Sequence, residues 1–247
     1  MLRLFVPRAH VEGARVRITG AELRHLRTLR LGPGERLAVF DEQGDEHDVR
    51  LERIGGHAAE ALIVATRRPA RESALDLTLA PALLKGTKMD LVVEKATELG
   101  VRRIVPLLSR WAVPQPHPQP GRHRTDRWRR IALAAAKQSG RTAVPLVEEP
   151  VALEAFVGRP ATGLRLLAWE GEHEVPLAAL PAHADAVVVA VGPEGGFTEA
   201  EVAAARVAGF ATVTLAPRVL RAETAAIVAA ALCLHRWGDL STTGRVS

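Results

Sequence analysis

The stretch VVVAVGPEGGFTEAEVAAARVAGF, residues 187–210, predicts the fold class of the chain. An apolar, mostly β-branched run typical of a buried strand ends at Gly192, and a helical pattern begins a few residues later. Thr198 is followed three positions later by Glu201, the spacing of a helix capping box. A strand that turns through glycines into a helix is typical of α/β folds, and it leaves free amides at a helix N-terminus. The pattern therefore indicates a ligand site at this corner.

The corner, residues 192–196, has the glycines of a phosphate-binding loop without its charge. Glu194 places a carboxylate inside the loop, the neighbouring sequence holds no lysine, and the spacing differs from G-x-G-x-x-G. A carboxylate repels phosphate. We therefore expect a ligand that carries adenosine without phosphates, or a cationic ligand.

A second corner, TLAPRVLRAETAAIVAAAL (214–232), follows the next expected strand. Arg218 and Arg221 precede a helix whose first turn holds Glu223 and Thr224. Each charge also has a structural explanation, because Glu223 can interact with the helix dipole and Arg221 can form a salt bridge to Glu223. Two charged loops at one edge of a sheet favour a functional site over these explanations.

Strand and helix patterns alternate from residue 74 onward. We expect strands at 74–83, 102–109, 143–150, 164–170, 186–192 and 211–216, and helices at 86–100, 125–140, 152–157, after 198, and at 223–237. This alternation predicts a mainly parallel sheet with helices on both faces, with ligands beyond the carboxyl ends of the strands. Residues 113–127 are expected to form a proline-rich loop, in which His117 and His123 are not spaced as metal ligands.

Residues 1–70 are expected to form a mostly β module with one helix at 19–31. Arg24, Arg27 and Arg30 recur every three residues, so they share one face of this helix. The module resembles a small RNA-binding barrel, with these three arginines as the RNA footprint. The alternative is an amphipathic helix with a solvated polar face. Residues 67–73 have the composition of a linker.

The composition favours a soluble, basic, cytoplasmic protein. The net charge is +5 and the pI about 10.2, which suits a polyanionic partner but equally suits simple solubility. The only cysteine, Cys233, can form no internal disulfide. No apolar run reaches the ~18 residues of a membrane span, and no Cys/His cluster suggests a metal site.

Two C-terminal motifs carry a resemblance to a known family. VGPEGGFTEAEV (191–202), followed by LAPRVLRAETAA (215–226), resembles the 16S ribosomal RNA uridine N3-methyltransferases of the SPOUT class. Three further segments look like parts of the same family in the same order, at 25–41, 85–101 and 134–145. The resemblance covers nearly the whole chain.

The resemblance implies a PUA-like RNA-binding domain at 1–70 and a SPOUT domain with a deep trefoil knot at 74–247. S-adenosylmethionine (SAM) would bind three loops, at about 168–172, 192–196 and 215–221, in a homodimer without a metal. The implied cofactor-binding residues are Ala168, Trp169, Glu170, Gly192, Pro193, Glu194, Gly195, Gly196, Leu215, Leu220, Arg221 and Thr224. The chain departs from the family pattern at Ala216, where glycine is common, and at Ala222, where threonine is usual.

The implied reaction is methylation of N3 of a uridine in 16S rRNA of the small ribosomal subunit. Arg221 is the candidate for stabilising the uracil anion, and Glu194 and Glu223 are candidates for the base or an orienting residue. Two alternatives stay open: a SPOUT enzyme acting on tRNA or on a ribose 2′-hydroxyl, and a non-catalytic RNA-binding ribosome assembly factor.

Overall fold

A computed structural model describes residues 1–112 and 121–240 of the chain. The chain forms two compact units. The N-terminal unit comprises Met1–Glu72 and Ala136–Val144, and the C-terminal unit comprises Ser73–Ala135 and Pro145–Ser247. The first division therefore falls inside the expected linker, and a later segment of nine residues joins the N-terminal unit. Within the described residues, no helix has the length and apolarity needed to cross a membrane.

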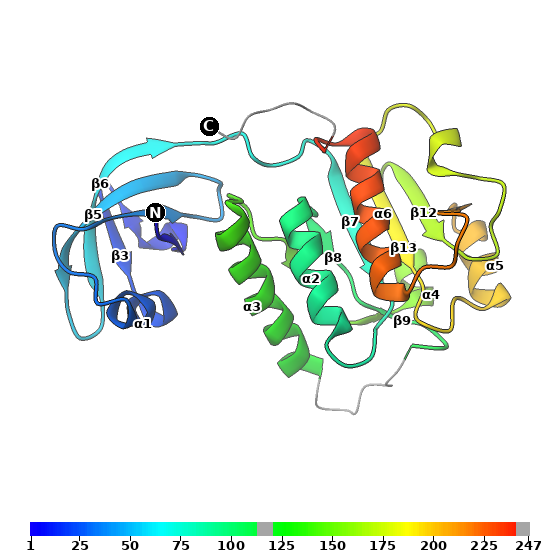
Figure 1. Cartoon of the computed structure of the whole chain (residues 1–247), viewed down its shortest axis with the longest axis horizontal. Helices are drawn as coiled ribbons and strands as arrows, with labels where there is room; N and C mark the ends of the chain where they lie inside the picture. The colour runs from blue at the N-terminus through cyan, green and yellow to red at the C-terminus, as the bar shows by residue number, and fades with distance from the viewer. Residues whose placement is uncertain (113–120, 241–247) are drawn as a thin grey trace. The chain divides into compact units, whose positions relative to one another are not determined.

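The N-terminal unit is built on a six-stranded sheet with the order β1-β4-β5-β6-β3-β2 (Figure 1). Its elements are β1 (Arg3–Phe5), η1 (Arg8–His10), β2 (Val11–Glu12), β3 (Arg15–Ile18), α1 (Gly20–Thr28), β4 (Arg36–Phe40), β5 (Glu46–Ile54) and β6 (Ala59–Arg67). Only β1 and β4 pair in parallel. Apolar residues of β1, β3, β4, β5 and β6 form one core with Leu23 and Leu26 of α1. One face of the sheet is therefore buried.

Helix α1 is shorter than the helix expected at 19–31. It ends at Thr28, and Arg30 takes a left-handed conformation with φ of 56°. The amide of Leu31 donates to the carbonyl of Leu26, which closes the last turn as helices with a left-handed cap do. The threefold spacing of the arginines continues past the helix end, so Arg30 does not share a helix face with Arg24 and Arg27.

The C-terminal unit contains a six-stranded, all-parallel sheet with the order β10-β8-β7-β13-β12-β14. Its strands are β7 (Asp76–Pro81), β8 (Arg103–Ile104), β10 (Leu146–Val147), β12 (Leu164–Ala168), β13 (Ala186–Val191) and β14 (Ala211–Val213); β9 (Leu107–Leu108) and β11 (Val151–Ala152) form a separate parallel pair. Its helices are α2 (Lys88–Leu99), α3 (Gly121–Ser139), which continues into the N-terminal unit, α4 (Leu153–Val157), α5 (Glu199–Val207) and α6 (Ala222–Trp237), with a short η2 (Leu177–Ala179). The expected parallel sheet is confirmed.

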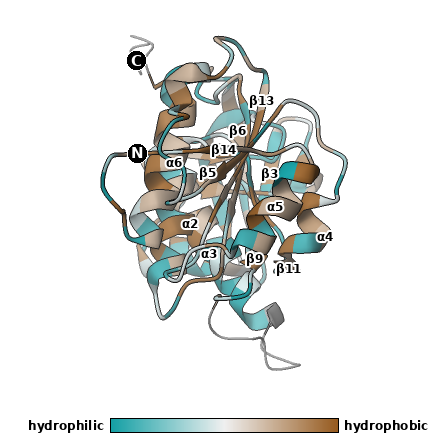
Figure 2. Cartoon of the chain, turned by 90° about the vertical axis from the view of Figure 1, so that its right-hand side faces the viewer, coloured by the Kyte–Doolittle hydropathy of each residue, from teal (hydrophilic) through white to brown (hydrophobic). Residues whose placement is uncertain are grey.

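Helices cover both faces of this sheet (Figures 1 and 2). Helices α2 and α6 pack together, and α6 lies against β7 and β13. Helices α4 and α5 cover the other face, where Phe156, Val202 and Phe210 form part of a second core. Strand β13 lies in the interior of the sheet, between β7 and β12, and is covered on both faces. This position explains why residues 187–191 are all apolar. The trefoil knot stays a prediction, and the return of the chain from the edge strand β14 to α6 over the middle of the sheet agrees with it.

Two expected elements have different bounds. The strand expected at 102–109 is two short strands, β8 and β9, which belong to different sheets and are separated by Val105 and Pro106. Proline has no amide hydrogen to continue a ladder. Helix α3 begins at Gly121, so the last part of the loop expected at 113–127 is helical, while His117 lies outside the described residues. Glycines in the left-handed conformation follow both α2 and α3, with φ of 111° at Gly100 and 78° at Gly140.

Candidate functional site

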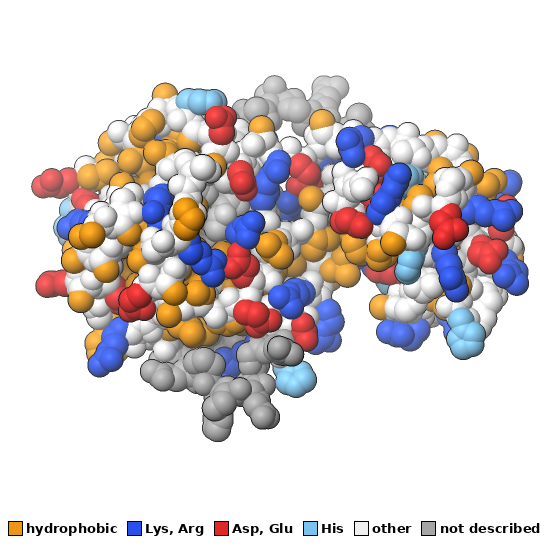
Figure 3. Space-filling model, turned by 180° about the vertical axis from the view of Figure 1, so that it is seen from behind, with side chains coloured by type: hydrophobic (Ala, Val, Ile, Leu, Met, Phe, Trp, Pro, Cys, Tyr) orange, Lys and Arg blue, Asp and Glu red, His pale blue; other side chains and the backbone are white. Residues whose placement is uncertain are grey.

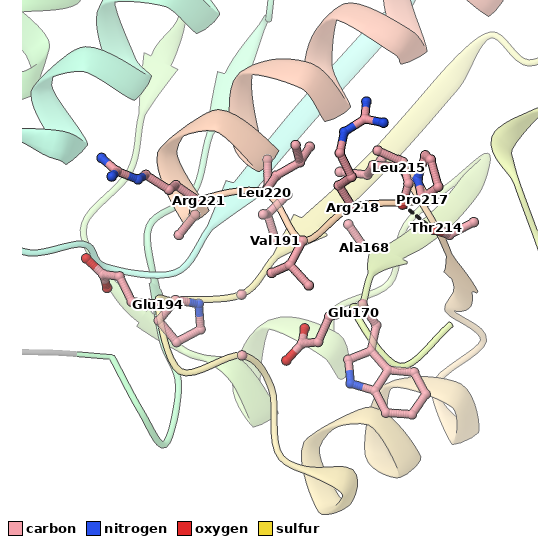
Figure 4. Close-up of a pocket in the computed structure, with 18 of the residues that line it drawn as sticks. Ala168, Glu170, Val191, Glu194, Thr214, Leu215, Pro217, Arg218, Leu220 and Arg221 are labelled. Carbon is pink, nitrogen blue, oxygen red and sulfur yellow. Dashed lines mark hydrogen bonds between the residues drawn. The ribbon is translucent and has the colours of Figure 1, made fainter. Parts of the chain in front are cut away.

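A pocket of about 960 Å³ lies beyond the carboxyl ends of β12, β13 and β14 (Figure 4). Neighbouring parallel strands end at the same edge, so the loops that follow them meet there. Ten of the predicted cofactor residues line the pocket: Ala168, Trp169, Glu170, Gly192, Pro193, Glu194, Gly196, Leu215, Leu220 and Arg221. Three loops distant in sequence therefore form one cavity.

The glycine corner is tightly built on its pocket side. A Cβ on Gly192 would lie 3.3 Å from the backbone carbonyl carbon of Gly196, and a Cβ on Gly196 would overlap the Glu170 carboxylate. Gly196 also has φ of 71°, a conformation that favours glycine. The expected capping box is confirmed, because the Thr198 side chain accepts from the Glu201 amide and the Glu201 carboxylate accepts from the Thr198 amide at 2.8 Å. The loop is therefore anchored at its exit.

Three predicted site residues lie outside the pocket lining. Gly195 faces away from it, since a Cβ there would lie 3.0 Å from Cβ of Trp111. Thr224 is exposed on α6, and Glu223 lies one position before it, partly buried. A helix turns each successive side chain by about 100°, so neighbours in its first turn cannot all face one cavity.

Lys88 brings a fourth segment to the site, which the sequence analysis did not identify. It is the first residue of α2, which follows β7, the strand next to β13. Its Nζ lies 2.9 Å from Oε1 of Glu194 and 3.3 Å from Oε2 of Glu223. The corner therefore has a lysine nearby in space, although none is nearby in sequence. The sequence held no signal for this contact, because it does not reveal that β7 and β13 are neighbours in the sheet.

These contacts shift the ionisation of both partners. Burial raises the pKa of Glu194, but hydrogen bonds from Lys88 and from the backbone amides of Glu194 and Lys85 together outweigh burial and lower it. The hydrogen bond to Glu194 is the largest cause of the raised pKa of Lys88, ahead of the opposing effect of desolvation. Both groups are therefore charged near neutral pH.

The two arginines of the second corner lie at the pocket without sharing its ion pairs. Arg221 is exposed and immediately precedes α6, and its side chain makes no capping bond. Glu223 contacts Lys88 instead, so the alternative of an Arg221–Glu223 salt bridge is wrong. In Figure 4 the guanidinium groups of Arg218 and Arg221 extend away from Val191, whereas Glu170 points toward the glycine corner. Positive charge thus lies at the rim of an apolar floor.

The remaining lining residues were not predicted as contacts. They are His173, Pro176, Val191, Thr214, Ala216, Pro217, Arg218, Val219, Ala222 and Ala225, with Lys88 already described. Residues 216–219 fall inside the expected loop 215–221, and His173, Val191, Thr214 and Ala222 lie one position outside an expected loop. Ala216 and Ala222, two of the departures from the family pattern, both line the pocket. Within the described residues, no group of three or more His, Cys, Asp or Glu side chains could hold a metal ion.

Two family models match most of this chain. The RNA methyltransferase domain matches residues 71–234, and the RNA methyltransferase PUA domain matches residues 18–64. The ribosomal RNA small subunit methyltransferase E of Synechocystis is 35% identical over 238 residues, covering 93% of this chain and 76% of the relative.

Two solved structures share nearly the whole fold. The ribosomal RNA small subunit methyltransferase E of Neisseria gonorrhoeae, solved with S-adenosyl methionine, has a TM-score of 0.88 at 33% identity and covers 97% of this chain and 99% of its own. A Legionella pneumophila protein described as a candidate methyltransferase, solved with bound SAM, has a TM-score of 0.89 at 30% identity, with coverage of 97% and 99%. The chain therefore belongs to the family of RNA methyltransferases with an N-terminal PUA domain, together with the ribosomal RNA small subunit methyltransferases E.

Proposed function

We propose that this chain is a SAM-dependent methyltransferase that methylates N3 of a uridine in 16S rRNA. The observation that carries the proposal is the pocket at the ends of β12, β13 and β14, which has an apolar floor and a rim of charged groups. It lies in a fold shared across its length with two proteins solved with SAM. The choice of N3 and of 16S rRNA rests on the resemblance of residues 191–202 and 215–226 to the uridine N3-methyltransferases.

The residues present fit SAM better than they fit a nucleotide. SAM has no phosphate, and the lining carboxylates Glu170 and Glu194 would repel one. The side chain of Lys88 is already paired with Glu194 and Glu223. The bound cofactor supplies an electrophilic methyl group next to a sulfonium charge.

The cofactor would be held mainly by backbone and apolar side chains. We propose that the backbone at Gly192 and Gly196 and the side chains of Leu215 and Leu220 contact it directly. The other residues that we place at the cofactor are Ala168, Trp169 and Pro193, whereas Gly195 and Thr224, which lie outside the lining, adjoin the loops that hold it. Because Gly192 and Gly196 have no Cβ, their backbone can approach the ligand closely.

The residues of the chain must make uracil N3 nucleophilic. N3 carries a proton at neutral pH, so the proton must leave and the resulting anion must be stabilised. We propose that Arg221 stabilises the anion and that Glu194, which is ionised and lines the pocket, accepts the proton. Its lowered pKa makes Glu194 a weak base, so the reaction depends on Arg221. Glu223 then orients Lys88, which in turn holds Glu194.

The proposed partner is 16S rRNA or the small ribosomal subunit in the cytoplasm, bound by a homodimer. The match of residues 18–64 to the PUA domain of RNA methyltransferases supports an RNA partner. The net charge of +5 is compatible with it. The homodimer is proposed from the resemblance to the uridine N3-methyltransferases.

Calorimetric titration with SAM tests the cofactor, and nucleoside mass spectrometry tests the product. We expect saturable SAM binding, and we expect 3-methyluridine to disappear from the 16S rRNA of a strain that lacks this gene. If the strain instead loses a ribose 2′-O-methylation or a methylated nucleoside of tRNA, that nucleotide is the substrate and uridine N3 of 16S rRNA is not. Unchanged RNA methylation together with no SAM binding would favour the non-catalytic alternative.

A further inference from the structure

The sheet of the N-terminal unit has one face turned away from its core. Residues of β3 alternate between exposed and buried, Arg36 is the exposed residue of β4, and Arg50 lies between the buried Val49 and Leu51 of β5; the buried residues of the core cluster pack with α1. Several of the exposed positions carry arginines, while Glu52 is also exposed and Glu60, opposite Arg17, is half-buried. We call this surface the arginine face, formed by Arg15 and Arg17 of β3, Arg36 of β4 and Arg50 of β5. Nothing in the catalytic proposal uses it.

Arg36 and Arg50 are directly opposite each other on adjacent antiparallel strands. The same cross-strand row continues through Leu62 to Arg15, so three arginines and one apolar side chain share it. Like charges in directly opposite positions are destabilising, because their Cβ atoms are only ~5 Å apart. Across residues 1–112 and 121–240, neither Arg36 nor Arg50 has a side-chain hydrogen bond or ion pair. The sheet therefore holds a repulsive pair without an acidic partner.

Other arginines of the same sheet are neutralised. Arg53 lies 2.9 Å from Glu60, and Arg67 lies 2.9 Å from Asp48. Arg15 is 3.8 Å from Glu52, at the edge of an ion pair. At the right of Figure 3, which shows the molecule from behind, Lys and Arg side chains of this unit alternate with carboxylates. The unpaired state of Arg36 and Arg50 is thus a local feature and not a consequence of a shortage of acids.

Helix α1, which packs on the buried face of the sheet, has fewer unpaired arginines on its surface than the sequence predicts. The guanidinium of Arg27 donates to the carbonyl oxygens of Gly55 and Gly56, at 2.5 and 2.9 Å. Arg30 lies beyond the end of α1. Arg24 is exposed on α1, and within the described residues its side chain makes no hydrogen bond or ion pair. In the described structure it is therefore the one arginine of the predicted footprint on α1 whose guanidinium is free.

We propose that the arginine face, centred on Arg36 and Arg50, binds the phosphodiester backbone of RNA. A phosphate between two guanidinium groups would turn their repulsion into two charge-assisted hydrogen-bonded contacts, and the planar fork of arginine suits phosphate oxygens. RNA is the polyanion that fits, because the chain is proposed to act on it, and the inference rests on that proposed function. The surface contacts backbone phosphates and therefore positions RNA without reading its sequence.

The test compares two double variants of the full chain that each remove two positive charges from this sheet. Arg36→Ala/Arg50→Ala removes the unpaired arginines, and Arg53→Ala/Arg67→Ala removes paired ones. Affinity for a short labelled single-stranded RNA of mixed sequence is measured by anisotropy over a series of salt concentrations. We expect the first variant to bind at least tenfold more weakly, and its salt slope to fall by about 0.7 for each phosphate that it no longer neutralises. The second variant should bind nearly as the wild type does.

A charge reversal separates binding from folding. Arg50→Glu places a carboxylate opposite Arg36, so the melting temperature should rise while RNA affinity falls. A destabilised or misfolded protein would lose both, so opposite signs support the proposal. The inference is overturned if both Arg36→Ala/Arg50→Ala and Arg50→Glu bind the RNA as the wild type does, or if only Arg24→Ala/Arg27→Ala/Arg30→Ala loses affinity.

Failure of the proposed function would look different. SAM titration of the same wild-type and variant samples is an independent readout, because the cofactor pocket lies in the C-terminal unit. If the wild type binds no SAM but its RNA affinity still depends on Arg36 and Arg50, the catalytic proposal fails and the arginine face stands. If SAM binds equally well in all variants and RNA affinity is also equal, only the arginine face fails.

Discussion

The two sheets of this protein present the two proposed binding surfaces in different ways. The parallel sheet of the C-terminal unit has helices on both faces, so only the ends of its strands are open to a ligand (Figure 2). The mostly antiparallel sheet of the N-terminal unit buries one face and leaves part of the other exposed, including the arginine face. The first kind of site depends on how closely backbones approach, and the second depends on the sum of separate charges. One added side chain should therefore disable the first, while single substitutions should change the second gradually.

The largest effect should come from filling the glycine corner. Gly196→Val adds a side chain where the Glu170 carboxylate lies, at a residue with φ of 71° that lines the pocket. We expect SAM binding to fall below detection by calorimetry. Gly209→Val is the matched control, because Gly209 has φ of 86° but open space around a Cβ.

The control should lose stability through backbone strain and keep SAM affinity. Equal SAM affinities of the two folded variants would show that the corner does not contact the cofactor. Gly195→Val probes the other side of the same loop, where the added side chain would meet Cβ of the exposed residue Trp111 at 3.0 Å, outside the pocket lining. Its SAM affinity should fall much less than that of Gly196→Val.

The next largest effect concerns the arginine at the pocket rim. Arg221→Ala should lower the single-turnover methylation rate by ~10²-fold, the scale of removing one donor to a developing anion. SAM affinity should change little, because this interaction is made mainly in the transition state. Arg221→Lys should recover part of the rate, since a point charge replaces a planar fork. A normal rate per folded molecule in Arg221→Ala would remove the residue from the mechanism.

A smaller effect is expected from removing the lysine that holds the two carboxylates. Lys88→Met removes the hydrogen bond to Glu194 and the ion pair with Glu223, and turnover should fall several-fold as Glu194 loses its position. In the wild type the Glu194 pKa is below its ordinary value of 4.5, so its favourable contribution is present above that value and is lost as pH falls through the lowered pKa. Without Lys88, burial raises this pKa, so the acid limb of SAM binding should move to higher pH. An acid limb that does not move would contradict the proposed role of the pair.

The smallest effect separates two arginines of α1. Arg27→Ala should lower the free energy of unfolding by about 1 kcal/mol, because its guanidinium bonds the carbonyl oxygens of Gly55 and Gly56. Arg24→Ala is the control on the same helix and should be close to neutral. Denaturant melts of both variants measure the difference. Equal stabilities would mean that the contacts of Arg27 are not maintained in solution.

Much of the C-terminal architecture was predictable, because hydrophobic periodicity reports local burial. The apolar run at 187–191 could be assigned to an interior strand, and Thr198 with Glu201 to a capped helix, from sequence alone. Predictions failed where spacing continued beyond an element. The arginine repeat continues to Arg30, although the chain leaves the helix at Thr28. The short strands β8 and β9 could not be separated, because an apolar run does not reveal which sheet each part joins.

The sequence by itself determined the order of strands and helices, the tight glycine corner and the charged corner that follows it. Each depends on residues close in the chain, whose preferences for φ, burial and capping act locally. Only the tertiary structure decided which charges meet. Lys88 lies 106 positions from Glu194, and they pair because β7 and β13 are neighbours in one parallel sheet. Likewise, Arg36 and Arg50 face each other because antiparallel register sets their opposition, and register depends on how a whole sheet buries its apolar face.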